Sequence, residues 1–419
     1  MSVQNKQTIW TRNFICMMLA NFMLQMSNFA TSTLVSTYAT FLGAGATLMG
    51  FLTGMFYGIS LVLRPVAGPV QTRMNHRKLM IAVFVLGFIV NVGYTMFHSI
   101  PMFLAFRVLH GVQYAFFGSL SMTIAADSVP QEKLASGLGF FALSGAVSQA
   151  IAPQIGISLV AWGTAQRGED FGYTVLFAYS TLLLLLGLVP LLVMRDDRRG
   201  RAQAAAAAPQ GKWYQQIVSR HAIIPTVIMT FIMMSFSNFN GFMVPFGKEL
   251  GIENIGIFFT VFAASMLVIR PIGGWLSDKL GLRNVLLPAI FLFCLSFLII
   301  GNAKAIPMIL VGAVLAAIGF GIGNPMTQAL TVQTETRARR SIASNTLYIG
   351  MDIGFFMGPL LGGIIRDLSG NYKTVILSAS IPLALALIVI FAAWKPCARR
   401  MAEVRELEAA EAEAEAAAE

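Results

Sequence analysis

An aspartate stands in the middle of an apolar, glycine-rich stretch of this sequence. Residues 347–363 read LYIGMDIGFFMGPLLGG, and Asp352 is the one charged residue among them. A lone carboxylate at the centre of a bilayer costs roughly 2.5 to 3.5 kcal/mol unless it is protonated, paired or in contact with water. Each of these conditions suits a group that takes up and releases a proton or holds a cation. The alternative is a hydrogen-bonded aspartate that fastens two helices together.

Helical spacing separates Asp352 from the glycines that surround it. At roughly 100° per residue, Gly354, Gly358 and Gly362 share one stripe of a helix and Asp352 lies on another side. Small residues four apart let a neighbouring helix approach closely, so the glycines predict packing. The residues that align with Asp352 are polar and predict a surface in contact with water or protein: Ser341, Asn345 and Tyr348.

Arg107 is the main opposite charge within an apolar run. It shares a stripe of helical spacing with Gly111, Tyr114, Gly118 and Ser121. His110 follows Arg107 by about one turn and is either a group that titrates near neutral pH or a hydrogen-bonded packing residue. Asp127 lies twenty residues beyond Arg107, about 30 Å along a helix, so it is expected at the helix end rather than beside Arg107.

The elements that must hold these side chains are membrane-spanning helices. Of the 419 residues, 56% are hydrophobic and 11% charged, with a mean hydropathy of +0.72; soluble domains are usually more charged. Apolar runs of spanning length predict twelve helices: 13–36, 48–70, 79–97, 101–126, 134–162, 173–194, 223–245, 255–276, 285–301, 307–331, 342–365 and 375–394.

The basic residues predict how the chain is oriented. The net charge is +10, and most of the 29 Lys and Arg fall on the side of the N-terminus. The positive-inside rule then predicts that both termini are cytoplasmic. The protein itself is expected in an inner or plasma membrane. Loop topology accounts for the charge, so no nucleic-acid partner is expected. The cysteines Cys16, Cys294 and Cys397 are scattered and predict neither a disulfide framework nor a metal site.

An internal repeat divides the chain into halves. Arg64-Pro65 recurs as Arg270-Pro271, Pro101 as Pro307 and Pro153 as Pro359, each after 206 residues. The fold class predicted is therefore all-α and membrane-integral, with twelve helices in two pseudo-symmetric six-helix bundles. We expect the bundles at 1–194 and 221–394, a cytoplasmic linker at 195–220, and a tail at 395–419 whose Ala/Glu run is either a solvated helix or disordered.

At this point the chain resembles the major facilitator superfamily over nearly its whole length. The stretch RPIGGWLSDKLGLRN, residues 270–284, is similar to the family's loop signature, and RPVAGPVQTRMNHRK, residues 64–78, is a weaker copy with Thr72 in place of the acidic residue. The resemblance implies a gating loop motif made of Arg64, Arg73, Arg77, Arg270, Asp278, Lys279 and Arg283. Snorkelling at the membrane surface is the alternative explanation for Arg64 and Arg270.

Further motifs are similar to those of the proton-coupled antiporters in that family. RVLHG, residues 107–111, resembles their fourth-helix motif, in which the arginine is associated with proton coupling, and GFFMGPLLGG, residues 354–363, resembles their fifth-helix motif but lies in the eleventh span. The family lines its central cavity with the first, fourth, seventh and tenth helices. The resemblance and the polar stripe of Asp352 together give these expected cavity-lining residues: Asn21, Gln25, Asn28, Ser32, Tyr114, Asn238, Asn240, Asn324, Gln328, Asn345 and Tyr348.

These observations predict a secondary transporter that works by alternating access and exports small organic molecules in exchange for protons. Asp352, Arg107 and His110 would carry the proton or the substrate charge. The alternative is a symporter or uniporter of a small organic anion or metabolite, bound at Arg107. An enzyme is not expected, because the four histidines are scattered and no phosphate-binding loop is present. The expected partners are a small-molecule substrate, protons and the lipid bilayer, with no cofactor and a monomeric chain.

Overall fold

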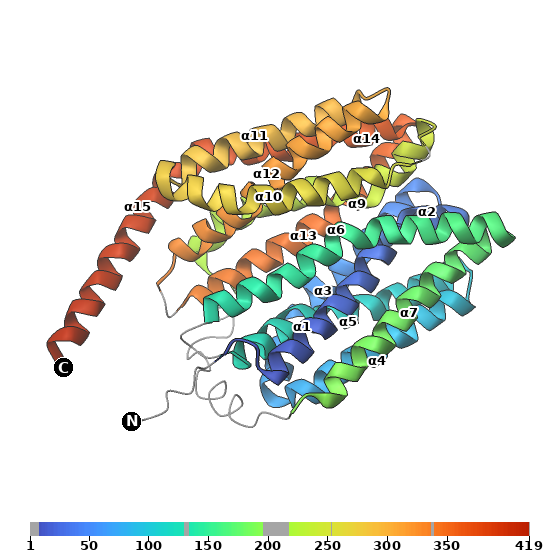
Figure 1. Ribbon diagram of the computed structural model, residues 1–419. Coiled ribbons are helices and arrows are strands. Elements are labelled where there is room, and N and C mark those ends of the chain that lie inside the picture. Colours follow the sequence, from blue (N-terminus) through green and yellow to red (C-terminus); the bar gives the residue numbers. More distant parts are fainter. Residues whose placement is uncertain (1–7, 130–133, 196–217, 253, 337–338, 419) are drawn as a thin grey trace. The chain divides into compact units, whose positions relative to one another are not determined.

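The computed structural model describes residues 8–129, 134–195, 218–252, 254–336 and 339–418. In these ranges the regular structure is helical, and twelve helices are long and apolar enough to cross a membrane, as the sequence predicts (Figure 1). Contacts group the chain into two compact units. The first unit comprises residues 1–44 and 55–208, and the second comprises residues 45–54 and 209–419. The predicted domain boundaries stay a prediction, and most of the predicted linker lies outside the described residues.

The first unit is a bundle of helices. Its helices are α1 (Arg12–Ser32), α2 (Val35–Phe41), α3 (Ala46–Arg73) from residue 55 onward, α4 (His76–Met96), α5 (Ile100–Asp127), α6 (Leu134–Arg167) and α7 (Glu169–Val193). α1 packs against α6 and α7, and α4 packs against α5 and α7. The buried core between them includes Phe14 and Met17 of α1, Phe84 of α4, Phe117 of α5 and Leu184 of α7.

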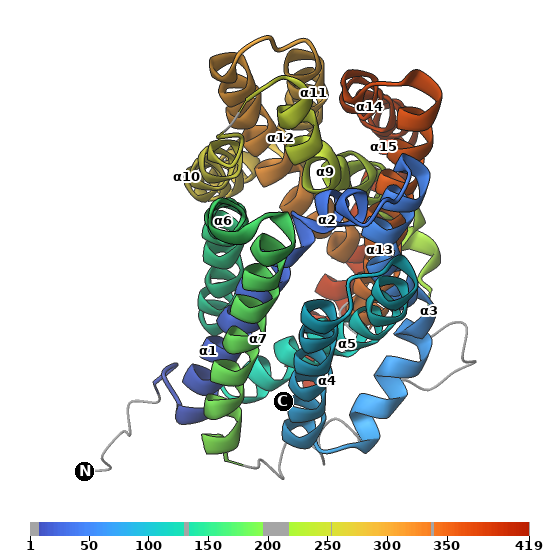
Figure 2. The same ribbon diagram turned by 90° about the vertical axis from the view of Figure 1, so that its right-hand side faces the viewer.

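The second unit repeats this helical arrangement. Its elements are η3 (Arg220–Ala222), α9 (Ile223–Glu249), α10 (Ile257–Leu280), α11 (Leu282–Gly301), α12 (Ile306–Gln333), α13 (Arg340–Ser369), α14 (Tyr372–Ser378) and α15 (Ser380–Ala418). α12 packs against both α10 and α11, a group that Figure 2 shows together. α9 packs against α13 and α15.

Turn residues set where several helices begin and end. Asn75 precedes α4, and its side-chain oxygen accepts a hydrogen bond of 3.0 Å from Lys78 N, which satisfies a donor of the first turn. Gly281 alone joins α10 to α11, with φ +81, and Gly370 ends α13 with φ +75. Glycine adopts these positive φ values without the steric cost that a Cβ would bring.

Two of the predicted spans differ from the helices observed. The run predicted at 13–36 is two helices, because α1 ends at Ser32 and Leu34, with φ −108 and ψ 1, has left the helical region before α2 begins. The run predicted at 375–394 begins in α14, and α15 starts after Ala379 and continues to Ala418. Of the two alternatives for the tail, the described part is therefore helical.

The glycine stripe of α13 packs against α9, which confirms the packing prediction. A Cβ added to Gly354 would lie 2.5 Å from the Thr230 carbonyl oxygen, and one added to Gly358 would overlap the Met234 carbonyl oxygen and Ser237 Oγ. Both obstacles include backbone atoms, which cannot turn aside as a flexible side chain does. The absence of side chains at these positions is what lets the two helices approach so closely.

A second glycine contact in the same unit was not predicted. The start of α3 packs against the C-terminal half of α13, where a Cβ on Gly50 would overlap the Pro359 carbonyl oxygen and one on Gly363 would overlap the Ala46 carbonyl oxygen. Asp367 fastens the same place, since its Oδ2 accepts hydrogen bonds from Thr47 N at 2.8 Å and Thr47 Oγ1 at 2.5 Å. Residues 45–54 therefore group with the second unit.

Candidate functional site

Asp352 is buried in α13. Its relative exposure is 2%, on a helix that is long and apolar enough to cross a membrane. Of the polar residues aligned with it, Tyr348 is exposed and Asn345 half-buried. A buried carboxyl on a spanning helix is stable only when it is protonated, paired with another group or in contact with water. The second unit thus holds a buried acid.

The first unit holds a buried cation and a network of hydrogen bonds. Arg107 of α5 has a relative exposure of 2%, and its guanidinium carbon lies 5.2 Å from the ring centroid of Phe56. Phe56 also packs edge-on against His110, at 4.7 Å between ring centroids, and lies 4.4 Å from the Tyr114 ring. Aromatic rings stabilise a cation held near their faces, so this surrounding suits the arginine charge.

His110 is held between two partners in the same unit. Its Nε2 lies 3.2 Å from Asn28 Oδ1, and its Nδ1 lies 3.3 Å from the Tyr94 hydroxyl. An amide oxygen only accepts hydrogen bonds, so Nε2 must donate to it, and Nδ1 then accepts from the hydroxyl in the neutral ring. This geometry agrees with the hydrogen-bonded alternative for His110. Asn28, which was expected to line a cavity, orients the imidazole.

Several of the expected cavity-lining amides lie between helices. Asn21 Nδ2 donates to Ser144 Oγ at 2.6 Å and ties α1 to α6. Asn238 Nδ2 donates to the Met234 carbonyl of its own helix at 2.9 Å. Asn238 Oδ1 would lie 2.6 Å from a Cβ added to Gly362, so the Asn238 side chain is part of the contact between α9 and α13. The other expected residues that are half-buried or exposed are Gln25, Ser32, Tyr114, Asn240, Asn324, Gln328, Asn345 and Tyr348.

Only part of the expected gating motif can be described. The side chains of Arg73 and Asp278 lie outside the described residues. Arg77 binds main-chain carbonyl groups. Its Nε donates to the Leu191 carbonyl at 2.9 Å and its Nη2 to the Leu192 carbonyl at 2.5 Å. Carbonyls of a last helical turn lack intrahelical partners, so Arg77 caps α7 with a favourable charge. Arg64 and Arg270 are half-buried near the ends of their spans.

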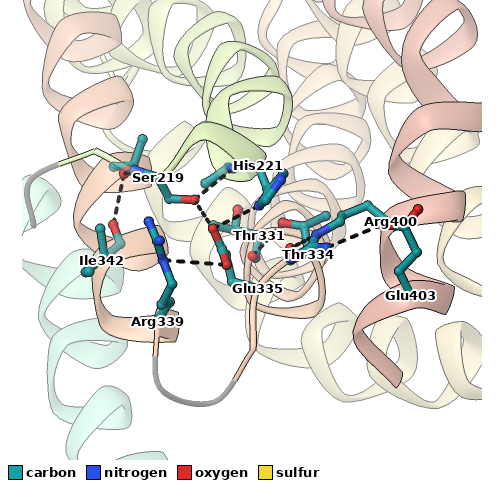
Figure 3. A network of polar contacts seen from close by, with 11 residues as sticks. Ser219, His221, Thr331, Thr334, Glu335, Arg339, Ile342, Arg400 and Glu403 are labelled. Carbon is teal, nitrogen blue, oxygen red and sulfur yellow. Dashed lines mark hydrogen bonds and ion pairs between the residues drawn. The ribbon is translucent and has the colours of Figure 1, made fainter. Parts of the chain in front are cut away.

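A buried glutamate that the sequence analysis did not select as a site residue organises the end of α12. Glu335 has a relative exposure of 2%, and its Oε1 accepts a hydrogen bond of 2.5 Å from Ser219 Oγ (Figure 3). His221 Nδ1 lies 3.2 Å from the same oxygen, and Arg339 Nε lies 3.9 Å from Oε2. Arg400 of α15 reaches the same corner and donates to the Thr334 carbonyl at 3.2 Å.

The first unit carries a comparable pair. Asp127 ends α5, as predicted, and its Oδ2 lies 3.7 Å from His76 Nδ1 at the start of α4. In each half, the helix that begins near Pro101 or Pro307 thus has a carboxylate beside a histidine at its C-terminal end. The signal available in the sequence was an acid close to the end of an apolar run in both repeats, one residue after it for Asp127 and four residues after it for Glu335.

We expect Glu335→Ala to destabilise the protein by about 2 kcal/mol, because it removes the acceptor of a buried, charge-assisted hydrogen bond. The two ion pairs add little, since the His221 and Arg339 side chains are more than a third exposed. The measurement is chemical unfolding of the purified full chain. Glu403→Ala is the control, because the Glu403 side chain is 46% exposed and pairs only with arginines of its own helix, and it is expected to change stability by less than about 0.5 kcal/mol. Equal effects of the two substitutions would contradict a structural role for the Glu335 cluster.

Comparison with known proteins identifies the family to which the chain is similar. The profile of the Major Facilitator Superfamily matches residues 17–252 and 225–416. The staphylopine export protein of Staphylococcus aureus is 23% identical over 359 residues, which cover 84% of this chain and 88% of that protein. The class H tetracycline resistance protein of Pasteurella multocida is 26% identical over 141 residues, covering 32% of this chain and 34% of that one.

Solved structures with the same fold extend over nearly the full chain. A bacterial homologue of the human lysosomal transporter Spinster, inward-facing and unoccupied, has a TM-score of 0.76 at 16% identity and covers 94% of this chain and 97% of its own. The nucleoside transporter NupG has a TM-score of 0.76 at 12% identity, with coverage of 91% and 99%. At these identities the likeness concerns the fold alone.

Proposed function

Because the chain belongs to the Major Facilitator Superfamily and is a multi-pass membrane transporter, we propose that it exports small organic molecules in exchange for protons, by alternating access. Export is supported by the relative of nearly equal length, which is an export protein, and by a tetracycline resistance protein among the partial matches. The observation that carries the proton part of the proposal is the buried carboxyl of Asp352 on a spanning helix.

Asp352 is the proposed proton carrier. A carboxylate at membrane depth is costly, roughly 2.5 to 3.5 kcal/mol at the helix centre, and protonation removes that cost. When the site opens to water, the ionised form is solvated and the proton leaves. When the site is closed from water, the neutral form is favoured. A group that changes its preferred charge with access couples proton movement to the transport cycle.

Arg107 is proposed to bind an anionic part of the substrate. Its cation is buried beside Phe56, where low polarity strengthens the attraction to a carboxylate or phosphate. His110 is proposed as a positioning residue, because both of its ring nitrogens are engaged with Asn28 and Tyr94. The sequence analysis predicts that His110 carries the proton or the substrate charge. The present proposal gives that role to Asp352 and Arg107 alone.

The test is transport by the purified full chain in sealed vesicles with imposed pH gradients of both signs. The panel of compounds begins with staphylopine and tetracycline, the compounds in the names of the relatives. We expect accumulation of a transported compound only when protons run in the opposite direction, and loss of accumulation when the gradient is collapsed. Accumulation in the direction of proton flow, or independent of the gradient, would overturn antiport.

The burial of Arg107 also favours the second candidate, a symporter or uniporter of a small organic anion. In that case the flux of an anion would follow the proton gradient or ignore it. The same vesicle experiment separates these outcomes by the sign of the gradient dependence. We further propose a monomer in the cell membrane with both termini cytoplasmic, supported by the positive-inside rule.

A further inference from the structure

Two cations lie against aromatic rings on either side of the turn that joins α10 to α11. Lys279 Nζ lies 4.1 Å from the ring centroid of Trp275, and the guanidinium carbon of Arg283 lies 6.0 Å from the Phe391 centroid and 5.9 Å from that of Trp394. We call these five residues the basic edge. Cations at these distances are attracted to the electron-rich faces of the rings, which hold them in place.

The chain path brings these residues to the same end of the second unit. Gly281 alone separates α10 from α11, so Lys279 and Arg283 lie on either side of one tight turn. α15 packs against α11, and its Phe391 and Trp394 reach Arg283 directly. The basic edge is therefore built from three spanning helices at the level where their apolar spans end.

The charges of the basic edge are not neutralised by carboxylates within the described part of the second unit. Neither Lys279 nor Arg283 forms an ion pair there, and Arg283 Nε is buried without a hydrogen-bond acceptor. The neighbouring Arg399 differs, because its Nε lies 3.4 Å from Glu403. The side chain of Asp278 lies outside the described residues.

The surroundings of these cations are apolar and open. Trp275 is 56% exposed and Phe391 is 61% exposed, on helices that cross the membrane. Exposed tryptophan at the end of a span lies at the headgroup level of the bilayer, and the rest of an exposed spanning face meets acyl chains. A ligand that fits must therefore carry an anion at the headgroup level and an apolar tail beside it.

We infer that the basic edge binds the phosphodiester of an anionic glycerophospholipid, with Arg283 and Lys279 on the phosphate and Trp275 and Phe391 beside the acyl chains. A planar guanidinium donates two parallel hydrogen bonds to a phosphate, and the ammonium of Lys279 adds a second charge. Basic sites between spanning helices are suited to anionic headgroups. This role is separate from the proposed proton antiport and does not depend on it.

The test is lipid retention by the purified full chain, measured by native mass spectrometry after exchange into equal parts of phosphatidylglycerol and phosphatidylcholine. We expect the unmodified chain to retain phosphatidylglycerol preferentially. Each charge near the surface contributes about fivefold to binding, so Lys279→Gln and Arg283→Gln should each weaken retention about fivefold and the double substitution about 25-fold. Trp275→Leu, which keeps both charges, should weaken it by a smaller factor.

Arg12→Gln is the matched control, because it removes one exposed charge at the start of α1 with no part in the basic edge. It should leave retention unchanged. Equal retention of the two lipids, or an equal loss in Arg12→Gln, would overturn the inference. A further arm adds glycerophosphoglycerol, the headgroup without acyl chains. If glycerophosphoglycerol displaced the lipid at equal concentration, the basic edge would be a site for a soluble anion instead. Lys279→Gln alone suffices if Arg283→Gln does not fold, since Lys279 is exposed.

Discussion

Asp352→Asn is expected to abolish proton-driven accumulation, by about a hundredfold or more in initial rate, because an amide of the same shape cannot carry the proton. Exchange of labelled for unlabelled compound without a pH gradient should continue within about threefold, since the helix packing around residue 352 needs no proton. The measurement compares both reactions in the same vesicles. This split between driven transport and exchange identifies coupling and separates it from loss of folding.

Asp170→Asn is the control for that experiment. Asp170 lies at the exposed start of α7, with its Oδ1 2.5 Å from His98 Nδ1, so the same chemical change occurs away from the proposed carrier. Its driven transport should stay near that of the unmodified chain. If Asp352→Asn still accumulated substrate against its gradient, Asp352 would be a structural residue and another group would carry the proton.

Gly358→Ala is expected to destabilise the chain by about 3 kcal/mol, the largest stability effect we anticipate from adding one methyl group. The new Cβ would overlap the Met234 carbonyl oxygen and Ser237 Oγ, so α9 and α13 would have to separate. The gain in helix propensity, up to about 1 kcal/mol, offsets only part of that cost. Chemical unfolding of the purified chain measures the difference.

Gly274→Ala provides the comparison within the same unit. Gly274 lies inside α10, and nothing lies within 4 Å of a Cβ placed there. Its substitution should be neutral or slightly stabilising, because only the propensity term remains. A Gly358→Ala protein as stable as Gly274→Ala would mean that the contact of α9 with α13 yields easily, and the packing role of the glycine stripe would have to be abandoned.

Hydropathy and spacing predicted what depends on local sequence. Twelve spans were predicted, and the described residues form twelve such helices, because an apolar run long enough to cross a bilayer has no other stable form there. The packing of Gly354 and Gly358 was also predictable, since residues four apart share a helix face. The break after Ser32 was not, because the residues on both sides of it are similarly apolar.

The contacts that tertiary structure decides were beyond the sequence analysis. Glu335 meets Ser219, which is 116 residues away in the chain, and Asn21 meets Ser144, which is 123 residues away. An amide on a spanning helix is compatible with a cavity wall or with a neighbouring helix, and helical spacing alone does not distinguish them. The assignment of Asp352, Arg107 and His110 to coupling or substrate binding stays a prediction.

The uninterrupted length of α15 has a mechanical consequence. Its 39 residues, at about 1.5 Å each, make a rod about 58 Å long, while about 20 residues suffice for the hydrocarbon layer. Arg400 and the buried Val404 anchor the rod beyond the apolar part, and the next residues, Arg405 to Leu407, are exposed. Because the helix is long, a small tilt of the last span moves its far end by a larger distance. A fluorophore attached near that end would report the movement by energy transfer during turnover.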